Sequence, residues 1–409
     1  MSNKNSINDN LIQIKEGNSK IYIYNDDLDA IPSKSMSVFY NKKMEINRDI
    51  TSLAIQSYYD LYAKDNLVIV DSMAGSGISS IRLLIECKNI EKIYINDINP
   101  VSEDLIHKNL ILNNLNEDNT KIKVMRNDAN LLFNKIAFKS NHKKPNVISI
   151  DPWGTPNYFI DSAFKAITKN NGLMCVTATD TAVLFGVKPN VCLRKYMAKP
   201  LHNEFCKEIG TRILLYFISR IANINNMGII PLLSFYSNHF IRVFVKTFKN
   251  KNLIIKNIKE YGYIFYCKKC GHRFSVENKD LKNINICKIC KSDIDLNYAG
   301  PLWLNKIHEL EFLNKILMLN NKSDFKNKNR IQKILEICQD EIDMPPNYYN
   351  LHKICKKKNC ASIPKIETLI EIIREKGFKA SRTHFDFISI KTDMEIKSLE
   401  NILSNYNKK

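Results

Sequence analysis

Residues 74–77 form a loop of small residues that could hold a nucleotide-type ligand. They read Ala-Gly-Ser-Gly and follow the apolar run 67–70, which Asp71 closes. Gly75 and Gly77 let backbone N–H groups approach a ligand closely, and a helix that starts directly after the loop favours negatively charged ligand groups. An ordinary strand–loop–helix connection has the same local pattern, so the loop alone leaves both interpretations open.

A carboxylate at the end of the next strand favours the ligand-binding interpretation. Asp97 follows the apolar run 92–96 and lies twenty residues after Gly77. At this spacing a carboxylate accepts hydrogen bonds from the ribose hydroxyls of a bound nucleotide. NAD and S-adenosylmethionine (SAM) both need such a group. The loop has one G-x-G and lacks the third glycine of a pyrophosphate site, which favours SAM.

Residues 151–156, Asp-Pro-Trp-Gly-Thr-Pro, form a second loop with reactive and aromatic side chains, directly after the buried run 147–150. Two prolines and a glycine make this loop rigid, and it lies at the carboxyl edge of the sheet, where ligands bind. Asp151 can accept a proton from a substrate amine. Pro152 fixes the backbone so that a neighbouring carbonyl points outward, and Trp153 offers a face for a stacked base. A structural turn around a buried indole is the alternative.

Two C-x-x-C pairs separated by sixteen residues predict a structural zinc site. The four cysteines are Cys267, Cys270, Cys287 and Cys290. Four thiolates fill a tetrahedral Zn²⁺ and leave no open position, so the metal is not expected to be catalytic. Free structural cysteines are the alternative. His352, Cys355 and Cys360 do not have the pattern of a convincing second site.

These side chains must be positioned by a chain in which strands and helices alternate. The apolar periodicity predicts five such repeats and hence a doubly wound, mostly parallel sheet. Two closely spaced runs, 228–235 and 240–247, predict a hairpin that completes seven strands and is typical of class I SAM-dependent methyltransferases. The other expected strands are 67–70, 92–96, 121–125, 147–150 and 172–178, and the expected helices are 51–63, 78–85, 101–115, 129–138 and 158–168.

Two further candidates flank this core. Residues 1–37 read as a polar arm with one short strand, 20–24, and Arg48 stands just before the first helix. A solvated surface arginine is the alternative for Arg48. Asp128 follows the third strand, where an acidic residue commonly faces the adenine amino group in SAM enzymes. The alternative for Asp128 is a cap of the following helix.

Composition indicates the class of partner. The chain has 409 residues, a net charge of +19 and a pI near 9.3, which favour a nucleic-acid partner over a membrane. Residues 246–291 carry twelve Lys or Arg against three Asp or Glu. No signal peptide or membrane-length apolar run is present, and the eleven cysteines fit a reducing, cytoplasmic environment. The sequence points to no protein partner.

The sequence predicts two domains. A SAM-dependent methyltransferase domain with its N-terminal arm covers 1–255, and an α+β domain that binds nucleic acid covers 256–409 and includes a zinc ribbon-like element at 267–290. Within the second domain we expect a lysine-rich connector at 320–330, helices at 331–342 and 365–377, and a basic strand pair at 379–390.

The chain resembles the archaeal-type tRNA (guanine-26-N2)-dimethyltransferases from about residue 38 to 391. The resemblance rests on VFYNKKMEINRDI, GSGISSIR, YINDINP, DPWGTP, GLMCVTATDTAVLFG, CLRKYMAKP, EIGTRIL, AGPLWL and SRTHF. It implies a class I SAM methyltransferase domain, a C-terminal domain peculiar to the family, and action on position 26 of tRNA. It also implies that Arg48, Asp97, Asp128 and Ala129 contact SAM and that Asp151 is catalytic.

The chain departs from the family pattern at Ser79, where the family usually has arginine before the retained Arg82. This puts one contact to the methionine carboxylate of SAM in question. We expect the Ser79 hydroxyl or the N–H groups of the helix N-terminus, with Arg48, to replace it.

The sequence therefore predicts transfer of methyl groups from SAM to the exocyclic amine of a guanine in tRNA, with the base extruded from its stack. The product is N2,N2-dimethylguanosine, formed through the monomethyl compound. One alternative is an exocyclic-amine methyltransferase for ribosomal RNA or DNA, and another is a zinc-bearing RNA-binding protein without catalysis. The single G-x-G, and the lack of a His or Lys suited to hydride transfer near the sheet edge, disfavour a NAD dehydrogenase.

Overall fold

The computed structural model describes residues 10–25, 36–115, 121–138, 143–281, 284–360 and 362–406. Residues 1–9 and 26–35 of the predicted arm lie outside this set. The described residues form two compact units. The first unit contains the described residues up to Thr179, together with Arg242–Lys249 and Asn314–Gln332. The second contains Asp180–Ile241, Asn250–Leu313 and the described residues from Lys333 on. The predicted functional division at residue 255 stays a prediction.

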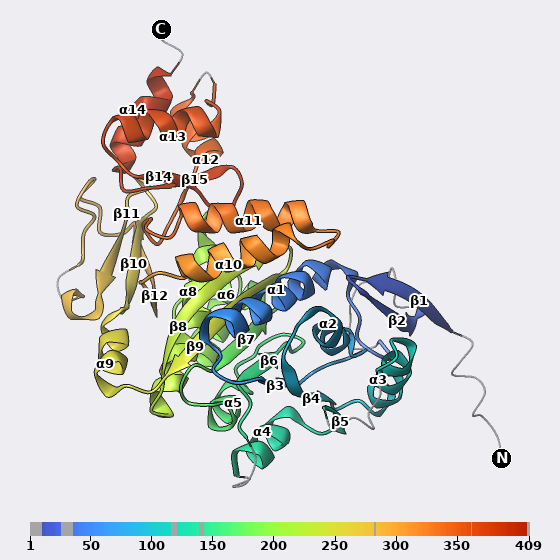
Figure 1. Ribbon diagram of the computed structural model, residues 1–409. Coiled ribbons are helices and arrows are strands. Elements are labelled where there is room, and N and C mark those ends of the chain that lie inside the picture. The colour runs from blue at the N-terminus through green and yellow to red at the C-terminus, as the bar shows by residue number, and fades with distance from the viewer. Residues whose placement is uncertain are drawn as a thin grey trace. The chain divides into compact units, whose positions relative to one another are not determined.

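Seven strands form the central sheet, in the order β5-β4-β3-β6-β7-β9-β8 (Figure 1). The first five pair in parallel. Two residues connect β8 to β9, and only antiparallel neighbours can be joined by so short a turn. The predicted class I, Rossmann-like α/β sheet is therefore confirmed. Its strands are β3 (Leu67–Asp71), β4 (Ile90–Asp97), β5 (Ile122–Arg126), β6 (Val147–Ile150), β7 (Leu173–Ala178), β8 (Gly228–Ser237) and β9 (Phe240–Phe248).

Helices cover both faces of the parallel part because the strand order reverses between β3 and β6. Right-handed crossovers place the first two connecting helices on one face and the next two on the other. In agreement, α2 contacts α3, and α4 contacts α5. The helices are α1 (Glu45–Tyr62), α2 (Ile78–Glu86), α3 (Pro100–Leu112), α4 (Ala129–Phe138) and α5 (Ile160–Ala166).

Local sequence accounts for where these elements begin and end. All five residues of β3 are buried, as expected of a parallel strand covered on both faces. Helix α3 begins with Pro100 at its first position, and the Asn99 side chain caps it by accepting the N–H of Val101 at 3.0 Å. These signals are local, so the periodicity of the sequence could predict them.

The N-terminal arm contains two strands where one was predicted. β1 (Leu11–Glu16) and β2 (Ser19–Tyr24) form an antiparallel hairpin around Gly17 and Asn18. A Gly-Asn pair between two alternating runs is a hairpin signal, and Gly17 has the positive φ (+53°) that the turn requires. The hairpin brings Glu16, which sequence reasoning did not single out, into the first unit.

The second unit contains the predicted zinc element. β10 (Tyr261–Cys267), β11 (Arg273–Glu277) and β12 (Leu296–Trp303) form an antiparallel sheet in the order β11-β10-β12. The sequence did not predict the helices that precede this sheet. They are α6 (Thr181–Leu184), α7 (Pro189–Tyr196), α8 (Cys206–Ile224) and α9 (Lys251–Lys259).

The C-terminal elements agree with most of the predicted pattern. The predicted connector at 320–330 is too long at both ends, because α10 (Leu310–Asn321) and α11 (Lys328–Asp340) both extend into it. The predicted strand pair is present as β14 (Ala380–Arg382) and β15 (Ser389–Thr392), with the short β13 (Tyr349–Asn350) beside β15. The remaining helices are α12 (Leu351–Lys358), α13 (Ile366–Glu375) and α14 (Ile396–Asn405). None of the helices in the described ranges has both the length and the hydropathy of a membrane-spanning segment.

Candidate active site

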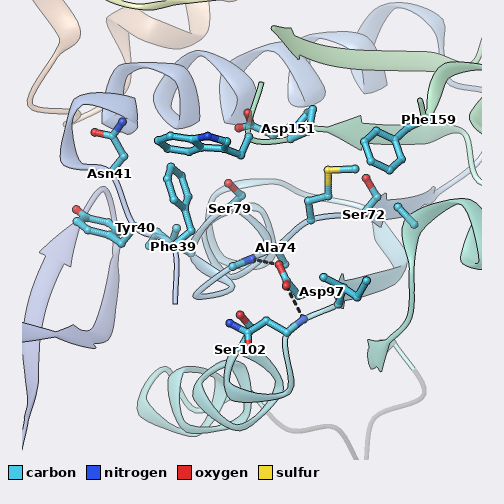
Figure 2. A pocket seen from close by; sticks show the side chains of 18 of the residues that line it. Phe39, Tyr40, Asn41, Ser72, Ala74, Ser79, Asp97, Ser102, Asp151 and Phe159 are labelled. Atoms are coloured by element: carbon cyan, nitrogen blue, oxygen red, sulfur yellow. Dashed lines mark hydrogen bonds between the residues drawn. The ribbon is translucent and has the colours of Figure 1, made fainter. Parts of the chain in front are cut away.

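A cavity of about 630 Å³ opens at the carboxyl ends of β3, β4 and β6 (Figure 2). Its volume is in the range of small-molecule sites, and its place is the point where the strand order reverses, which is where open α/β sheets bind ligands. Most of the predicted site residues line it. They are Arg48, Gly75, Ser79, Asp97, Asp128, Ala129, Asp151, Pro152 and Trp153. Gly77 is not among the lining residues.

The two glycines of the β3–α2 loop are required by the backbone. Gly75 has a φ of +54°, and a Cβ there would come within 2.8 Å of the carbonyl oxygen of Phe39. Gly77 has a φ of +79° at the N-cap of α2, and a Cβ there would press on the Ile106 side chain at 3.0 Å. The loop can therefore turn tightly beneath the cavity only with glycine at both positions.

Asp97 is held in place by backbone donors. Its Oδ2 accepts the N–H of Gly75 at 2.8 Å, and its Oδ1 accepts the N–H of Asn99 at 3.0 Å, as the dashed lines in Figure 2 mark. Each carboxylate oxygen can accept more than one hydrogen bond, so the side chain keeps acceptor capacity toward the cavity that it lines. The arrangement suits a pair of ribose hydroxyls.

Asn96 was missed by sequence reasoning and connects the loops around Asp97. This fully buried side chain donates from Nδ2 to the carbonyl oxygens of Ser72 (2.9 Å) and Asn127 (3.0 Å). Its Oδ1 accepts the N–H of Asn127 at 3.0 Å. One amide thus holds together the segments that follow β3 and β5. An asparagine as the penultimate residue of a buried strand was the signal that could have indicated this role.

Asp128 caps the following helix and also lines the cavity, and its contact to adenine stays a prediction. Its Oδ1 accepts the N–H groups of Asn130 (2.9 Å) and Leu131 (3.2 Å), which caps α4. The same residue lines the cavity, together with Ala129, the first residue of the helix. The cap fixes the carboxylate at the cavity wall.

Arg48 is buried, so the alternative of a solvated surface arginine is wrong. Its Nε lies 2.5 Å from Glu16 Oε1, and its Nη2 lies 2.6 Å from Glu16 Oε2. Tyr40 donates its hydroxyl to the same carboxylate at 3.1 Å. Burial opposes ionisation of Glu16, but the charges and hydrogen bonds of Arg48 and Arg82 together outweigh it and hold the pKa of Glu16 below its usual value. Arg48 therefore lines the cavity with its charge already paired.

Arg82 lies in the same buried group of charges and does not line the cavity. Its guanidinium pairs with Asp49 (2.6 Å), Glu86 (2.9 Å) and Glu16 (3.2 Å). Three carboxylates around one guanidinium satisfy its donors, which a buried charge requires. This arginine supports the packing of the hairpin, α1 and α2.

The loop after β6 is fixed to the end of β7. Gly154 donates its N–H to Thr179 Oγ1 at 2.7 Å, and its carbonyl oxygen accepts the Thr179 N–H at 2.9 Å. Gly154 has a φ of +102°, which a side chain would strain. Asn47 on α1 donates from Nδ2 to Asp151 Oδ2 at 3.4 Å. These contacts position Asp151 from both sides.

Trp153 is 49% exposed, so the alternative of a buried indole is wrong. Its ring meets that of Phe39 edge to face, with centroids 5.3 Å apart and an angle of 74° between the planes. Phe39 is itself 41% exposed, and both rings line the cavity. Phe39 was not predicted as a site residue.

Three carboxylates stand at the ends of neighbouring strands: Asp71 on β3, Asp97 on β4 and Asp151 after β6. Burial raises the pKa of Asp71 to about 6, and the hydrogen bond from Ser80 Oγ (2.7 Å) limits this rise, while the charges of Asp151 and Asp97 add to it. A negative potential at the cavity favours a positively charged ligand group, such as the sulfonium of SAM.

The four predicted zinc ligands meet at one end of the β10–β12 sheet. The Sγ atoms of Cys267 and Cys290 are 3.5 Å apart, and those of Cys270 and Cys287 are 3.6 Å apart. Zn–S bonds of about 2.3 Å in a tetrahedron place sulfurs about 3.8 Å apart, so the cluster fits the ion. Each C-x-x-C pair forms the same turn. Gly271 donates its N–H to the carbonyl oxygen of Cys267, and Lys291 donates its N–H to the carbonyl oxygen of Cys287.

A second group of metal-ligand side chains, which sequence reasoning missed, is buried in the second unit. It comprises His308, Cys338, Glu341 and His384. Glu341 accepts hydrogen bonds from Thr383 (2.8 Å) and His384 Nδ1, and the ammonium of Lys391 lies 3.5 Å away. The N–H of Ser234 is donated to His308 Nδ1 (3.4 Å), which leaves the ring proton on Nε2. These bonds join the group in a buried hydrogen-bonded network centred on Glu341.

Comparison with known proteins decides the family. A sequence model of the N2,N2-dimethylguanosine tRNA methyltransferases matches residues 17–404. The chain belongs to this family. The tRNA (guanine(26)-N(2))-dimethyltransferase of Methanosphaera stadtmanae is 36% identical over 390 residues, which cover 95% of this chain and 96% of that protein. The enzyme of the same name from Pyrococcus abyssi is 31% identical over 402 residues, with 97% and 99% covered.

The solved structure of Trm1 from Pyrococcus horikoshii in complex with SAM has the same fold. It superposes with a TM-score of 0.80 at 29% identity and covers 96% of this chain and 99% of that one. The predicted family, fold class and enzyme class, a SAM-dependent methyltransferase, are confirmed.

In this dimethylguanosine tRNA methyltransferase, Ser79 is the second residue of α2 and lines the cavity. The first N–H groups of a helix have no partner within the helix and favour an anion. The N-terminus of α2 and the Ser79 hydroxyl therefore border the cavity that Arg48 also lines, and the charge of Arg48 is paired with Glu16.

Proposed function

We propose that this protein transfers methyl groups from SAM to N2 of the guanine at position 26 of tRNA, giving N2,N2-dimethylguanosine through the monomethyl form. The observation that carries the proposal is the cavity at the ends of β3, β4 and β6. It brings Asp97, Asp128 and Asp151 together with two exposed aromatic rings in a chain of this family. The proposal includes a cytoplasmic location, where tRNA and reduced thiols coexist.

SAM supplies an electrophilic methyl group on a positively charged sulfur. In our assignment Asp97 accepts the ribose hydroxyls, and Asp128 with Ala129 borders the adenine. Gly75 lets the loop backbone approach the ligand, and Gly77 lets α2 begin close to it. The helix N-terminus, together with Ser79, receives the methionine carboxylate. We assign Arg48 to the same end of the cofactor, with its charge moderated by Glu16.

Asp151 is the group we assign to the chemistry. The exocyclic amine of guanine is a poor nucleophile because its lone pair is delocalised into the ring. A carboxylate that accepts one N–H orients the amine and takes its proton as the N–C bond forms and the S–C bond breaks. The contact from Asn47 Nδ2 to Oδ2 leaves Oδ1 for the substrate. A backbone carbonyl of the Asp151–Pro152 turn can hold the second N–H. The monomethyl product keeps one N–H, so Asp151 can accept the proton of the second transfer once it has released the first proton to solvent and fresh SAM has bound.

The rings of Trp153 and Phe39 support an extruded base. A guanine within a stacked arm cannot reach Asp151, so it must leave the stack, and aromatic faces compensate for the lost stacking. Both rings are about half exposed at the mouth of the cavity that contains Asp151. This edge-to-face pair of rings offers an exposed aromatic surface for the base in the same cavity as Asp151, the proposed proton acceptor.

The second part of the proposal concerns residues 256–409. Cys267, Cys270, Cys287 and Cys290 would hold one structural Zn²⁺, and the basic stretch around them would bind tRNA phosphates. Zinc would stabilise this segment, because metal binding to a site that is absent in the unfolded chain contributes to folding.

Nucleoside analysis of tRNA tests the function directly. Unmodified tRNA transcripts with G26 or A26 are incubated with the protein and SAM, then digested and analysed by mass spectrometry. We expect mono- and dimethylguanosine from the G26 transcript and none from the A26 transcript. Equal methylation of both transcripts, or methylation of ribosomal RNA or DNA alone, would contradict the assigned substrate. SAM binding without any methylation would favour the non-catalytic RNA-binding alternative.

A further inference from the structure

Five aromatic side chains form a continuous row across one face of the β11-β10-β12 sheet, and we refer to them as the aromatic ladder. Ring centroids lie 5.1 Å apart for His272 and Phe274, 5.3 Å for Phe274 and Phe265, 5.7 Å for Phe265 and Tyr298, and 5.8 Å for Tyr298 and Tyr263. The planes of Phe265 and Phe274 are nearly parallel, at 10°. All five residues belong to the second unit.

Strand register explains why the rings share a face. Phe265 on β10 is paired with Phe274 on β11 and with Tyr298 on β12, and directly opposite residues lie on the same side of a sheet. On the opposite face the adjacent pair Ile264 and Ala299 is fully buried. The sheet thus has apolar packing at that pair and carries the aromatic rings on its other face.

The ladder is accessible at its rim. Tyr298 is 38% exposed, and Tyr263 and Phe274 are partly exposed, while Phe265 at the centre is covered by its neighbours. The rings of Tyr298, Tyr263 and Phe274 leave apolar area in contact with water, and burial of that area by a ligand is favourable.

A cation lies beside the exposed ring of Tyr298. Lys199 exchanges two backbone hydrogen bonds of 2.8 Å with Gly300, two residues after Tyr298. Its Nζ lies 4.1 Å from the centroid of the Tyr298 ring. An ammonium beside exposed rings complements a ligand that has both a flat ring and a negative charge. The basic excess of residues 246–291, a range that includes β10 and β11, adds to this complementarity.

We propose that the aromatic ladder, with Lys199 at its edge, is a stacking platform for an unpaired nucleotide of the tRNA other than the one being methylated. A nucleotide has the required flat base and phosphate, and single-stranded segments are bound by combining aromatic faces with cations. The nucleotide must be unpaired, because paired bases within a helix keep their faces stacked on each other. This inference rests on the proposed function for the identity of the RNA.

Binding of unmodified tRNA to the full-length zinc-loaded protein tests the platform. Removing one stacked base contact lowers affinity by roughly 5- to 150-fold, so Tyr298→Ala should weaken tRNA binding by that amount. Tyr298→Phe should bind like the wild type, because the ring face is kept. Phe138→Ala, which removes an 83% exposed ring from α4, is the matched control and should have no effect. Unchanged SAM affinity and zinc content in each variant show that the fold is intact.

Two further measurements separate stacking from other roles. The loss in Tyr298→Ala should disappear on a fully paired RNA hairpin with its loop capped by a non-nucleotide linker. The salt dependence of tRNA binding should be unchanged in Tyr298→Ala, whereas Lys199→Ala should reduce its log–log slope by about 1. Equal tRNA affinity of Tyr298→Ala and wild type overturns the proposal, and so does an equal loss on the paired hairpin. Methylation of the G26 transcript by the wild type is read separately, so a failure of the proposed function is distinguished from a failure of the platform.

Discussion

The guanidinium of Arg48 is held at two points by the carboxylate of Glu16, at 2.5 and 2.6 Å. Glu16 ends the first strand of the N-terminal hairpin, while Arg48 lies on α1 and lines the cavity. The hairpin therefore supports the cavity wall through an ion pair, although none of its own residues lines the cavity.

We predict that Glu16→Gln lowers the free energy of unfolding by roughly 3 kcal/mol, because removing one partner of a buried ion pair leaves the other charge uncompensated. Urea denaturation measures the change. Glu91→Gln is the matched control, since Glu91 pairs with Lys143 at 2.7 Å on the surface and such pairs contribute at most about 1 kcal/mol. Equal effects of the two substitutions would contradict the structural role of Glu16.

Asp97→Ala should weaken SAM binding by roughly 1.5–3 kcal/mol, the usual contribution of hydrogen bonds to a charged group. The substitution also removes the acceptor for the N–H groups of Gly75 and Asn99, which should loosen the loop. Calorimetric titration with SAM measures the effect, and exposed Asp104→Ala serves as control. Unchanged affinity in Asp97→Ala would remove Asp97 from the cofactor site.

Asp151→Ala should lower turnover by roughly a hundredfold or more while SAM affinity stays nearly intact, because it loses the proton acceptor and not a cofactor contact. Asp151→Asn can still orient the amine but is a far weaker base, so it separates orientation from proton transfer. Asn47→Ala should reduce turnover less than either, since it removes only a 3.4 Å contact to Oδ2. Single-turnover methylation of tRNA at saturating SAM is the measurement. Substantial activity in Asp151→Ala would exclude this group from the chemistry.

The repeating core could be predicted from sequence because its signals are local. The run 147–150 coincides with β6, and 129–138 coincides with α4. Helix α8 was missed for a physical reason. Its buried residues run without a break from Glu208 to Ser219, so it has no polar stripe to reveal a helical period.

Some of the contacts around the site could also be predicted from local sequence, and others could not. Asp97, Asp128 and Asp151 follow strands directly, and strand ends converge at one edge, so their meeting could be predicted. The pairing of Glu16 with Arg48 and the network around Glu341 join residues that are far apart in sequence, and no local pattern encodes them. The exposure of aromatic rings could not be predicted either. The sequence places Trp153 in the loop but does not show whether its indole faces solvent or the core.

The network around Glu341 predicts a pH dependence of stability. Burial lowers the pKa of His308 to about 4, although Glu341 favours its charged form. A histidine whose folded pKa lies below its unfolded value near 6.5 stabilises the fold above pH 6.5 and loses that contribution as the pH falls toward 4. The pKa of Glu341 is held well below its usual value by His384 and Lys391, against the effect of burial, so its contribution is lost only at still lower pH.

We therefore expect the free energy of unfolding to fall by about 3 kcal/mol between pH 6.5 and 4 through His308. The slope over this window should be smaller in His308→Gln, whereas exposed His202→Gln should keep the slope of the wild type. Urea denaturation at several pH values provides the data. A His308→Gln variant with the full wild-type slope would show that this ring does not govern the acid sensitivity.

The last prediction concerns zinc and its separation from cofactor binding. Cys267→Ser with Cys270→Ser leaves two of four ligands, so the ion at this site should be lost and residues around 260–295 destabilised. Transfer RNA binding should weaken, with a shallower dependence on salt, because basic residues near the cysteines contact phosphates only when the segment is folded. SAM binding should survive, since every residue that lines its cavity lies between Met36 and Phe159. Cys360→Ser, outside the cluster, is the matched control. Metal analysis comes first: less than about one zinc per wild-type chain would contradict the assignment, and full tRNA affinity without zinc would separate the metal from RNA binding.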